Sequence, residues 1–143
     1  MELGALAWLI LAPALGALAL SAFPAEAKAA QRGTATAISL VPLAIALWLW
    51  SRFDASATAF QFVERASWIP RFGISWYLGI DGISLLLVLL TVVLTPLVLY
   101  AATQSIHKRL KAYLVSMLLL ESAMLGTLVA LDLVLFYVFW ELM

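Results

Sequence analysis

Long apolar runs separated by short polar links are the feature that most limits what this chain can fold into. A helix needs about 20 consecutive apolar residues to cross the ~30 Å hydrocarbon core of a bilayer. Four such runs occupy residues 3–22, 34–50, 83–102 and 112–131, and a fifth covers 133–143. In lipid, backbone N–H and C=O groups must be satisfied within the segment, so such runs predict transmembrane helices. The sequence therefore predicts an all-α integral membrane protein, a bundle of about five helices whose fifth member is incomplete.

The composition agrees with this class and excludes several others. Hydrophobic residues make up 66% of the chain and charged residues 11%, against about 45–50% and about 25% in soluble proteins. The net charge is zero, so nothing suggests a nucleic acid partner. The absence of cysteine removes disulfides, thiolate metal sites and cysteine nucleophiles. The single histidine, His107, cannot build a metal site alone, and we interpret it as a solvated loop residue.

The charges predict the orientation of the helices. All eight basic residues lie between the apolar runs. The links 23–33 and 103–111 share one side of the membrane and together hold five Lys or Arg, whereas the 51–82 link holds three Arg and three acids. The positive-inside rule therefore predicts that 23–33 and 103–111 are cytoplasmic and that the N-terminus is outside. The first run is not read as a secretory signal, because Glu2 precedes it and no basic residue does.

The link at 51–82 is the longest polar stretch and is rich in aromatic residues. Aromatic side chains gather at membrane interfaces, so we favour an ordered interfacial loop over the alternative of a ligand site. Within it, residues 72–78 alternate weakly between apolar and polar and predict a short strand. Asp81 is a suitable N-cap for the helix that follows.

Two acids interrupt the apolar runs. Glu121 lies ten residues beyond Lys111, about 15 Å along a helix, and Glu141 lies nine beyond Asp132, about 14 Å. Half of the hydrocarbon core is ~15 Å, so both carboxylates are predicted near the midplane, on consecutive antiparallel helices. Tyr137, at i−4, is expected to share the face of Glu141. Acids at this depth commonly mark ion or proton routes.

Two interpretations of these acids remain open. In the first, the carboxyl is a proton site, balanced between burial, which favours its neutral form, and a nearby cation, which favours its charged form. No Lys or Arg of this chain lies at that depth, so the cation would come from another segment or subunit. In the second, the acids stay protonated in a purely structural subunit. We favour the first for Glu141, whereas the two are balanced for Glu121, whose small neighbours favour close helix packing.

Two stretches resemble a known family. Residues 68–91 read WIPRFGISWYLGIDGISLLLVLLT and residues 131–143 read LDLVLFYVFWELM. Together they resemble the N-terminal part of the subunit M family of bacterial NADH:quinone oxidoreductase (respiratory complex I). This family is antiporter-like and is related to Mrp-type cation/proton antiporter subunits. The spacing of the apolar runs is similar to that of the family over the whole chain. The first two runs resemble the family only in their apolar character.

The resemblance implies a proton-translocating subunit with fourteen transmembrane helices in a bacterial plasma membrane, of which this chain would be the N-terminal part. Its partners would be lipid and the other membrane subunits. The family's Phe-Trp-Glu motif matches Phe139, Trp140 and Glu141, and its glutamate is essential for proton pumping together with a lysine on a later helix. NADH, FMN, iron–sulfur clusters and quinone bind to other subunits of the family's complex, so no cofactor is expected in this chain. The motif transfers no firm role to Glu121.

Other functions remain as alternatives. The same glutamate would serve in an Mrp-type antiporter subunit, or in a related ferredoxin- or hydrogen-linked ion pump, without oxidation of NADH. A structural subunit with protonated acids is the third possibility. The electron donor, the electron acceptor and the transported ion, H⁺ or Na⁺, stay open from the sequence. Co-purification of flavin and iron–sulfur centres would separate the first reading from the others.

Overall fold

Five helices and one β-hairpin make up the structure, a computed structural model that describes residues 4–24, 26–106 and 108–143. For 102–105 only the backbone is described, and the prediction for His107 lies outside the described residues. The predominantly helical, five-helix architecture is confirmed. The elements are α1 (Ala5–Ser21), α2 (Lys28–Arg52), β1 (Gln61–Ile69), the short 3-10 turn η1 (Pro70–Phe72), β2 (Ile74–Ile80), α3 (Gly82–Ser105), α4 (Leu110–Val129) and α5 (Leu133–Leu142).

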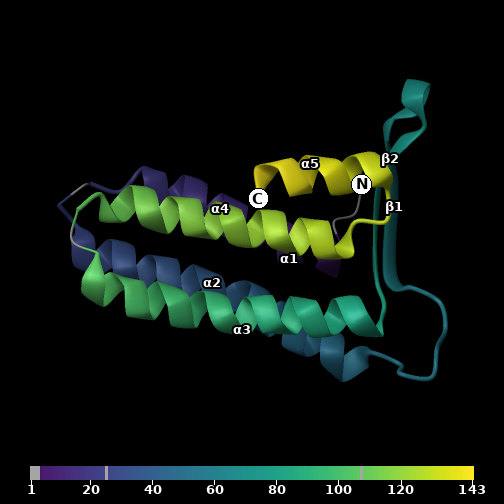
Figure 1. Cartoon of the computed structure of the whole chain (residues 1–143), viewed down its shortest axis with the longest axis horizontal. Helices are drawn as coiled ribbons and strands as arrows, with labels where there is room; N and C mark the ends of the chain where they lie inside the picture. The colour runs from purple at the N-terminus through teal and green to yellow at the C-terminus, as the bar shows by residue number, and fades with distance from the viewer. Residues whose placement is uncertain (1–3, 25, 107) are drawn as a thin grey trace.

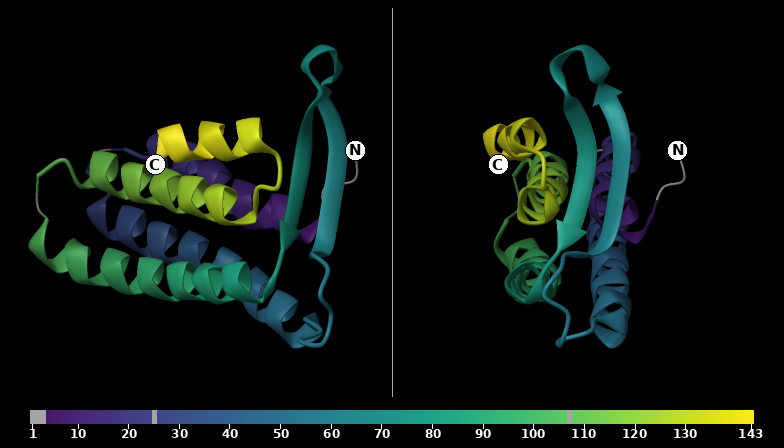
Figure 2. Two further views of the ribbon diagram at one scale, coloured as in Figure 1. Left: turned by 45° about the vertical axis from the view of Figure 1, so that its right-hand side comes forward. Right: turned by 90° about the vertical axis from the view of Figure 1, so that its right-hand side faces the viewer.

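Helices α1 to α4 run side by side, and the hairpin crosses one end of the bundle (Figure 1). Helix α1 packs against both α2 and α4, and α3 also contacts both of these helices. Helix α5 starts beside the hairpin and runs back along α4, so that it ends part way along the bundle (Figure 2). Leucine, isoleucine, valine and alanine side chains from these helices and from β2 fill the space between them.

Three helices, α2, α3 and α4, are long and apolar enough to cross a bilayer, whereas α1 and α5 are apolar but shorter. The predicted spans at 3–22, 34–50, 83–102, 112–131 and 133–143 each fall on one of the five helices. The largest difference is at α2, which begins at Lys28 rather than at residue 34. There the Gln31 side chain donates to the Pro24 carbonyl at 2.6 Å. Polar residues thus continue the helix beyond its apolar run, and that run alone does not mark the helix end.

A proline lies inside each of α1, α2 and α3, at Pro13, Pro42 and Pro96. Proline has no N–H, so Pro13 leaves the carbonyl four residues earlier without its helical donor. Beside this break, the Ser122 hydroxyl of α4 donates to the Ile10 carbonyl of α1 at 2.7 Å. A side chain of one helix therefore bonds the backbone of its neighbour at the place where the backbone ladder is weakened.

The predicted loop at 51–82 contains the hairpin. The strand expected at 72–78 is confirmed as β2, displaced by two residues to Ile74–Ile80. Its antiparallel partner β1 was not predicted, because neighbouring Glu64 and Arg65 break the alternation that would mark a strand. The pairing shifts register between Gln61 and Glu64, where Phe62 adopts a φ of 53°. This is a bulge, which re-aims the side chains around it.

The hairpin and the residue that follows it, Asp81, bond to the starts of three helices. The Glu64 carboxylate accepts from the Leu6 N–H at 2.7 Å and the Ala7 N–H at 3.2 Å, so a residue of β1 caps the start of α1. The predicted cap at Asp81 is confirmed, because its carboxylate accepts from the Ser84 N–H at 2.7 Å. That bond, with the Ser84 hydroxyl, holds the pKa of Asp81 below its ordinary value. The third link, at the start of α5, positions the candidate site.

Candidate functional site

Asp132 fixes the start of α5. One oxygen of its carboxylate accepts from the N–H groups of Val134 at 2.9 Å and Leu135 at 3.2 Å, which caps the helix. The other accepts from the Ser75 N–H at 3.0 Å and the Ser75 hydroxyl at 3.2 Å. The Ser75 N–H is the main reason that the pKa of Asp132 lies below its ordinary value. Strand β2 and helix α5 are therefore joined through one ionised side chain.

A glycine lets α5 approach α4 closely. The ring of Phe139 lies against Gly126, where a Cβ on the glycine would be 2.5 Å from the ring Cγ. No real side chain tolerates that separation, so only glycine fits unless the ring moves. Phe139 also meets Trp76 of β2 in an edge-to-face contact, with ring centroids 6.2 Å apart. Phe139 therefore fixes the second half of α5, two residues before Glu141.

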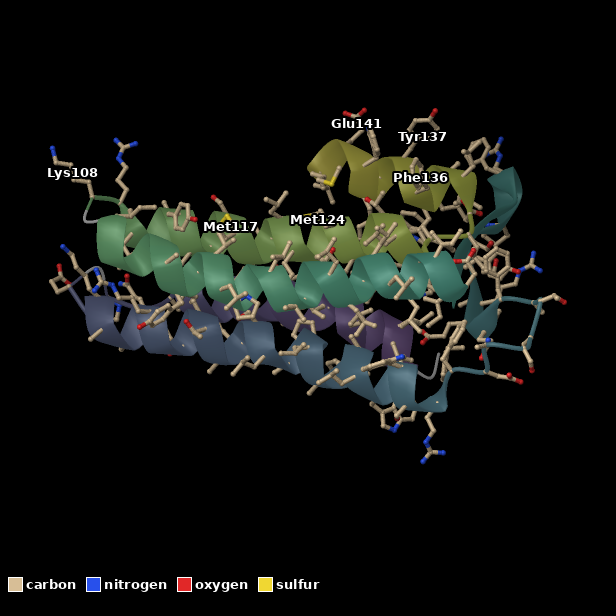
Figure 3. The ribbon with its side chains drawn as sticks, turned by 60° about the horizontal axis from the view of Figure 1, so that its bottom comes forward. Lys108, Met117, Met124, Phe136, Tyr137 and Glu141 are labelled. Atoms are coloured by element: carbon tan, nitrogen blue, oxygen red, sulfur yellow. The ribbon has the colours of Figure 1, made fainter. Side chains whose placement is uncertain are left out.

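Glu141 lies on the face of α5 that points away from the rest of the molecule. Its side chain is exposed, and Figure 3 shows it projecting outward on the same side as Tyr137. The sequence prediction that these two residues share a face agrees with this view. Trp140 stacks on Phe136 with ring centroids 5.8 Å apart, which orders the neighbouring aromatic side chains. The carboxylate is thus presented to whatever covers this face of α5.

Glu121 is placed very differently. Its side chain is 1% exposed, and neither carboxylate oxygen has a hydrogen-bond partner among the described residues. The polar side chain that faces it is Thr95 of α3, whose hydroxyl donates to the Thr91 carbonyl at 3.0 Å. A hydroxyl oxygen that donates elsewhere still has lone pairs. A protonated Glu121 can therefore donate to Thr95, whereas an ionised one accepts from Thr95 only if that hydroxyl gives up its bond to the Thr91 carbonyl.

The two acids lie at similar depths but do not form one site. The contact of Gly126 with Phe139 gives a common reference level for the two helices. Glu121 precedes Gly126 by five residues, about 7.5 Å along α4, and Glu141 follows Phe139 by two residues, about 3 Å along α5. Because the helices are antiparallel, both distances run away from the hairpin end of the bundle. Glu121 therefore lies about 4–5 Å farther from that end than Glu141 does. One carboxylate faces the α3 side of α4 and the other faces outward.

The buried hydroxyl groups near Glu121 were not identified from the sequence. Thr91 and Thr95 of α3 and Ser122 of α4 are 6–8% exposed. Their signal was present in the sequence, since Thr91 and Thr95 are four residues apart and so share a helix face. Among the described residues, no three His, Cys, Asp or Glu side chains are grouped as a metal ion would require.

Comparison with known proteins supplies the family. The model described as NADH-ubiquinone oxidoreductase chain 4, amino terminus, matches residues 33–131. The chain belongs to this family. The matched segment includes Glu121 and ends before Glu141.

Individual members of the family match over nearly the whole chain. NADH-ubiquinone oxidoreductase chain 4 of Arabidopsis thaliana is 40% identical over 95% of this chain and 28% of its own length. The chain of the same name from Marchantia polymorpha is 38% identical with the same coverage. NADH-quinone oxidoreductase subunit M of Rickettsia conorii is 33% identical over 99% of this chain and 30% of its own length. The chain thus spans less than a third of these relatives.

Proposed function

We propose that this chain is the amino-terminal part of a proton-translocating membrane subunit of a bacterial NADH:quinone oxidoreductase. The observation that carries the proposal is the position of Glu141, an exposed acid about 14 Å along the bundle from the Asp132 cap. An acid at that depth is costly unless a further group accompanies it. The names of the relatives add the quinone oxidoreductase context.

Glu141 is the proton-carrying group in this proposal. A cation brought to its exposed face by another segment would favour the ionised carboxylate. Withdrawal of that cation would favour the protonated form, so that Glu141 takes up a proton when the neighbouring charge moves. Phe139 and the Asp132 cap keep α5 fixed while this occurs. Tyr137, on the same outward face, supplies a hydroxyl one turn away.

Glu121 is a second proton-holding group, between α3 and α4. Its carboxylate oxygens are buried without a hydrogen-bond partner in the described part of the chain, which is unfavourable for stability. Acids placed at such a cost inside a membrane commonly have a functional role. Substitution by Gln keeps the size and removes the titration. If proton pumping in the Glu121→Gln variant equals that of the wild type, Glu121 has only a structural role.

Purification of the full natural subunit in mild detergent tests the proposed complex. We expect flavin and iron–sulfur absorbance to co-purify, together with NADH-dependent reduction of a quinone. Partners without redox centres, accompanied by Na⁺/H⁺ exchange in vesicles, would instead establish the Mrp-type antiporter reading. Reduction by ferredoxin or hydrogen in place of NADH would identify a related ion pump. The bacterial plasma membrane is the proposed location, with the N-terminus and the hairpin outside.

A further inference from the structure

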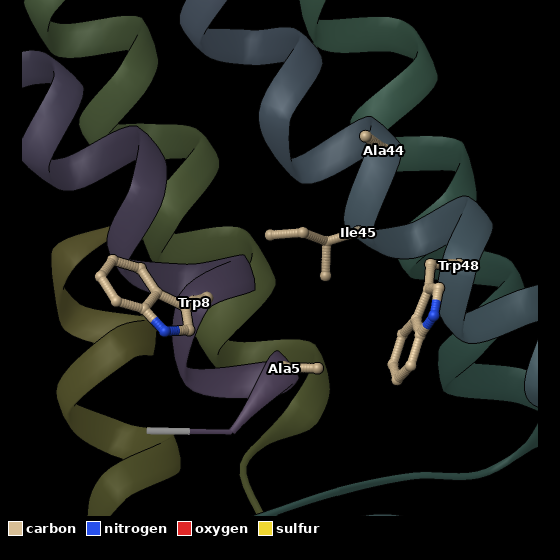
Figure 4. A pocket seen from close by; sticks show the side chains of 5 residues that line it. All are labelled: Ala5, Trp8, Ala44, Ile45 and Trp48. Carbon is tan, nitrogen blue, oxygen red and sulfur yellow. The ribbon is translucent and has the colours of Figure 1, made fainter. Parts of the chain in front are cut away.

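A hollow lined by apolar side chains lies between α1 and α2, near the end of the bundle that carries the hairpin. Its volume is about 490 Å³, and Ala5, Trp8, Ala44, Ile45 and Trp48 line it. Figure 4 shows the two indoles standing on opposite sides, with Ala5 and Ile45 between them. The small side chains of Ala5 and Ala44 leave the space open. We refer to this hollow as the tryptophan groove.

The walls of the groove are held in place by the hairpin. The Trp48 ring meets Phe62 of β1, with centroids 5.9 Å apart. Phe62 reaches this position from the bulge, where its φ of 53° is unusual for a bulky residue. Backbone strain of this kind persists where the surrounding structure requires it. The bulge therefore fixes one wall of the groove before any ligand binds.

A positive charge lies at one end of the groove. The Arg52 guanidinium lies over the Trp48 ring, 5.9 Å from its centroid, and the Arg52 side chain is exposed. Arg52 ends α2, one turn beyond Trp48 and thus about 6 Å nearer the end of the bundle. Trp8 lies three residues from the start of α1, about 4.5 Å from the same end. The indoles are thus at the depth where tryptophans border the hydrocarbon, and the arginine is at headgroup level.

We propose that the tryptophan groove binds one anionic phospholipid, with an acyl chain between Trp8 and Trp48 and the phosphate at Arg52. The apolar lining suits a hydrocarbon chain and excludes a polar solute. A guanidinium recognises phosphate through several N–H donors in a planar arrangement. Arginine near the membrane surface also favours anionic lipids electrostatically. This inference does not depend on the proton-translocating role of Glu141.

Native mass spectrometry of the full natural subunit, with the partners that co-purify, tests the site. The probes are phosphatidylglycerol and phosphatidylcholine with identical acyl chains. We expect one phosphatidylglycerol to bind more tightly than phosphatidylcholine. Arg52→Gln is expected to weaken phosphatidylglycerol binding by about fivefold, the effect of one cation at the surface, and to leave phosphatidylcholine unchanged. Ala44→Leu, which fills the groove, is expected to abolish this binding for both lipids.

Two controls separate the site from general effects of charge and bulk. Arg65 lies 5.0 Å from the Tyr77 ring centroid on the hairpin, away from the groove, so Arg65→Gln should leave lipid binding unchanged. Ala112 is an exposed alanine of α4, so Ala112→Leu should also have no effect. Equal binding of the two lipids, or equal losses in Arg52→Gln and Arg65→Gln, would overturn the proposal. So would a photoreactive side chain at Ala44 that cross-links to a protein segment rather than to lipid.

Discussion

Asp132, the residue that begins α5, accepts hydrogen bonds from both the backbone N–H and the hydroxyl of Ser75, 57 positions earlier in the chain. Ser75 lies in β2, so the hairpin and the helix that carries Glu141 are joined directly. A second bond, from the Leu131 N–H to the Tyr77 carbonyl at 2.8 Å, runs beside the first. The hairpin is therefore the support on which α5 is positioned, besides covering one end of the bundle.

Removal of the Asp132 carboxylate should loosen α5. In Asp132→Ala, the cap of α5 and the two bonds to Ser75 are lost together. We expect the unfolding temperature of the full natural subunit to fall by about 2–4 °C, with faster hydrogen exchange in α5. Asp54→Ala is the matched control, because the Asp54 carboxylate bonds only to Ser56 of its own loop among the described residues. Equal effects of the two substitutions would contradict the role given to Asp132.

The link between Asp132 and Ser75 should depend on pH. The Ser75 N–H holds the pKa of Asp132 below 3.8, its ordinary value. A group with a lowered pKa in the folded state stabilises that state above its ordinary pKa, and this contribution is lost as the pH falls through the lowered value. The unfolding temperature should therefore fall more between pH 5 and pH 3, both approximate limits, in the wild type than in Asp132→Asn. Parallel decreases in the two proteins would show that other acids dominate.

A side chain at Gly126 should displace α5. A Cβ there would overlap the Phe139 ring, so Gly126→Ala forces the ring or the helix to move. The expected loss of stability is about 1–3 kcal/mol, the usual cost of overpacking. The double variant with Phe139→Leu should recover part of this loss, because the smaller side chain vacates the space. Additive losses in the double variant would mean that the two residues are not in contact.

The direction of the helices can be measured with single cysteines, since the 143 residues contain none. Ser67 of β1 and Lys108, before α4, are exposed near opposite ends of the bundle. In right-side-out membrane vesicles that carry the full natural subunit, an impermeant maleimide should label Ser67→Cys and spare Lys108→Cys until the membrane is opened. The reverse pattern would invert the proposed topology. Any native cysteine outside these residues would first be replaced by serine.

The helices could be predicted because their signal is local. Apolar runs and the charges between them are properties of consecutive residues, so all five helices could be predicted. The hairpin was recognised only in part, because β1 contains Glu64 and Arg65 side by side and gains its stability from pairing with β2. The long-range role of Glu64 as a cap for α1 joins residues 58 positions apart. No local pattern reveals such a contact.

The sequence predicted how far along the bundle the two acids lie, but not which way their side chains point. Counting residues from the ends of the helices was enough to place Glu121 and Glu141 at comparable heights. Whether each side chain points inward or outward depends on which helix faces each residue. The burial of Glu121 against α3 and the exposure of Glu141 depend on how the helices pack, which cannot be derived from local sequence patterns.

The proposed role of Glu141 is tested by proton pumping per NADH oxidised, measured in vesicles that carry Glu141→Gln in the full natural subunit. Gln keeps the size of the side chain and cannot release a proton. We predict that the complex still assembles, while the pH gradient formed per NADH falls by on the order of tenfold. Glu121→Gln, measured in parallel, shows whether the buried acid between α3 and α4 also takes part in pumping. Pumping per NADH at the wild-type level in Glu141→Gln would show that Glu141 does not carry the pumped proton.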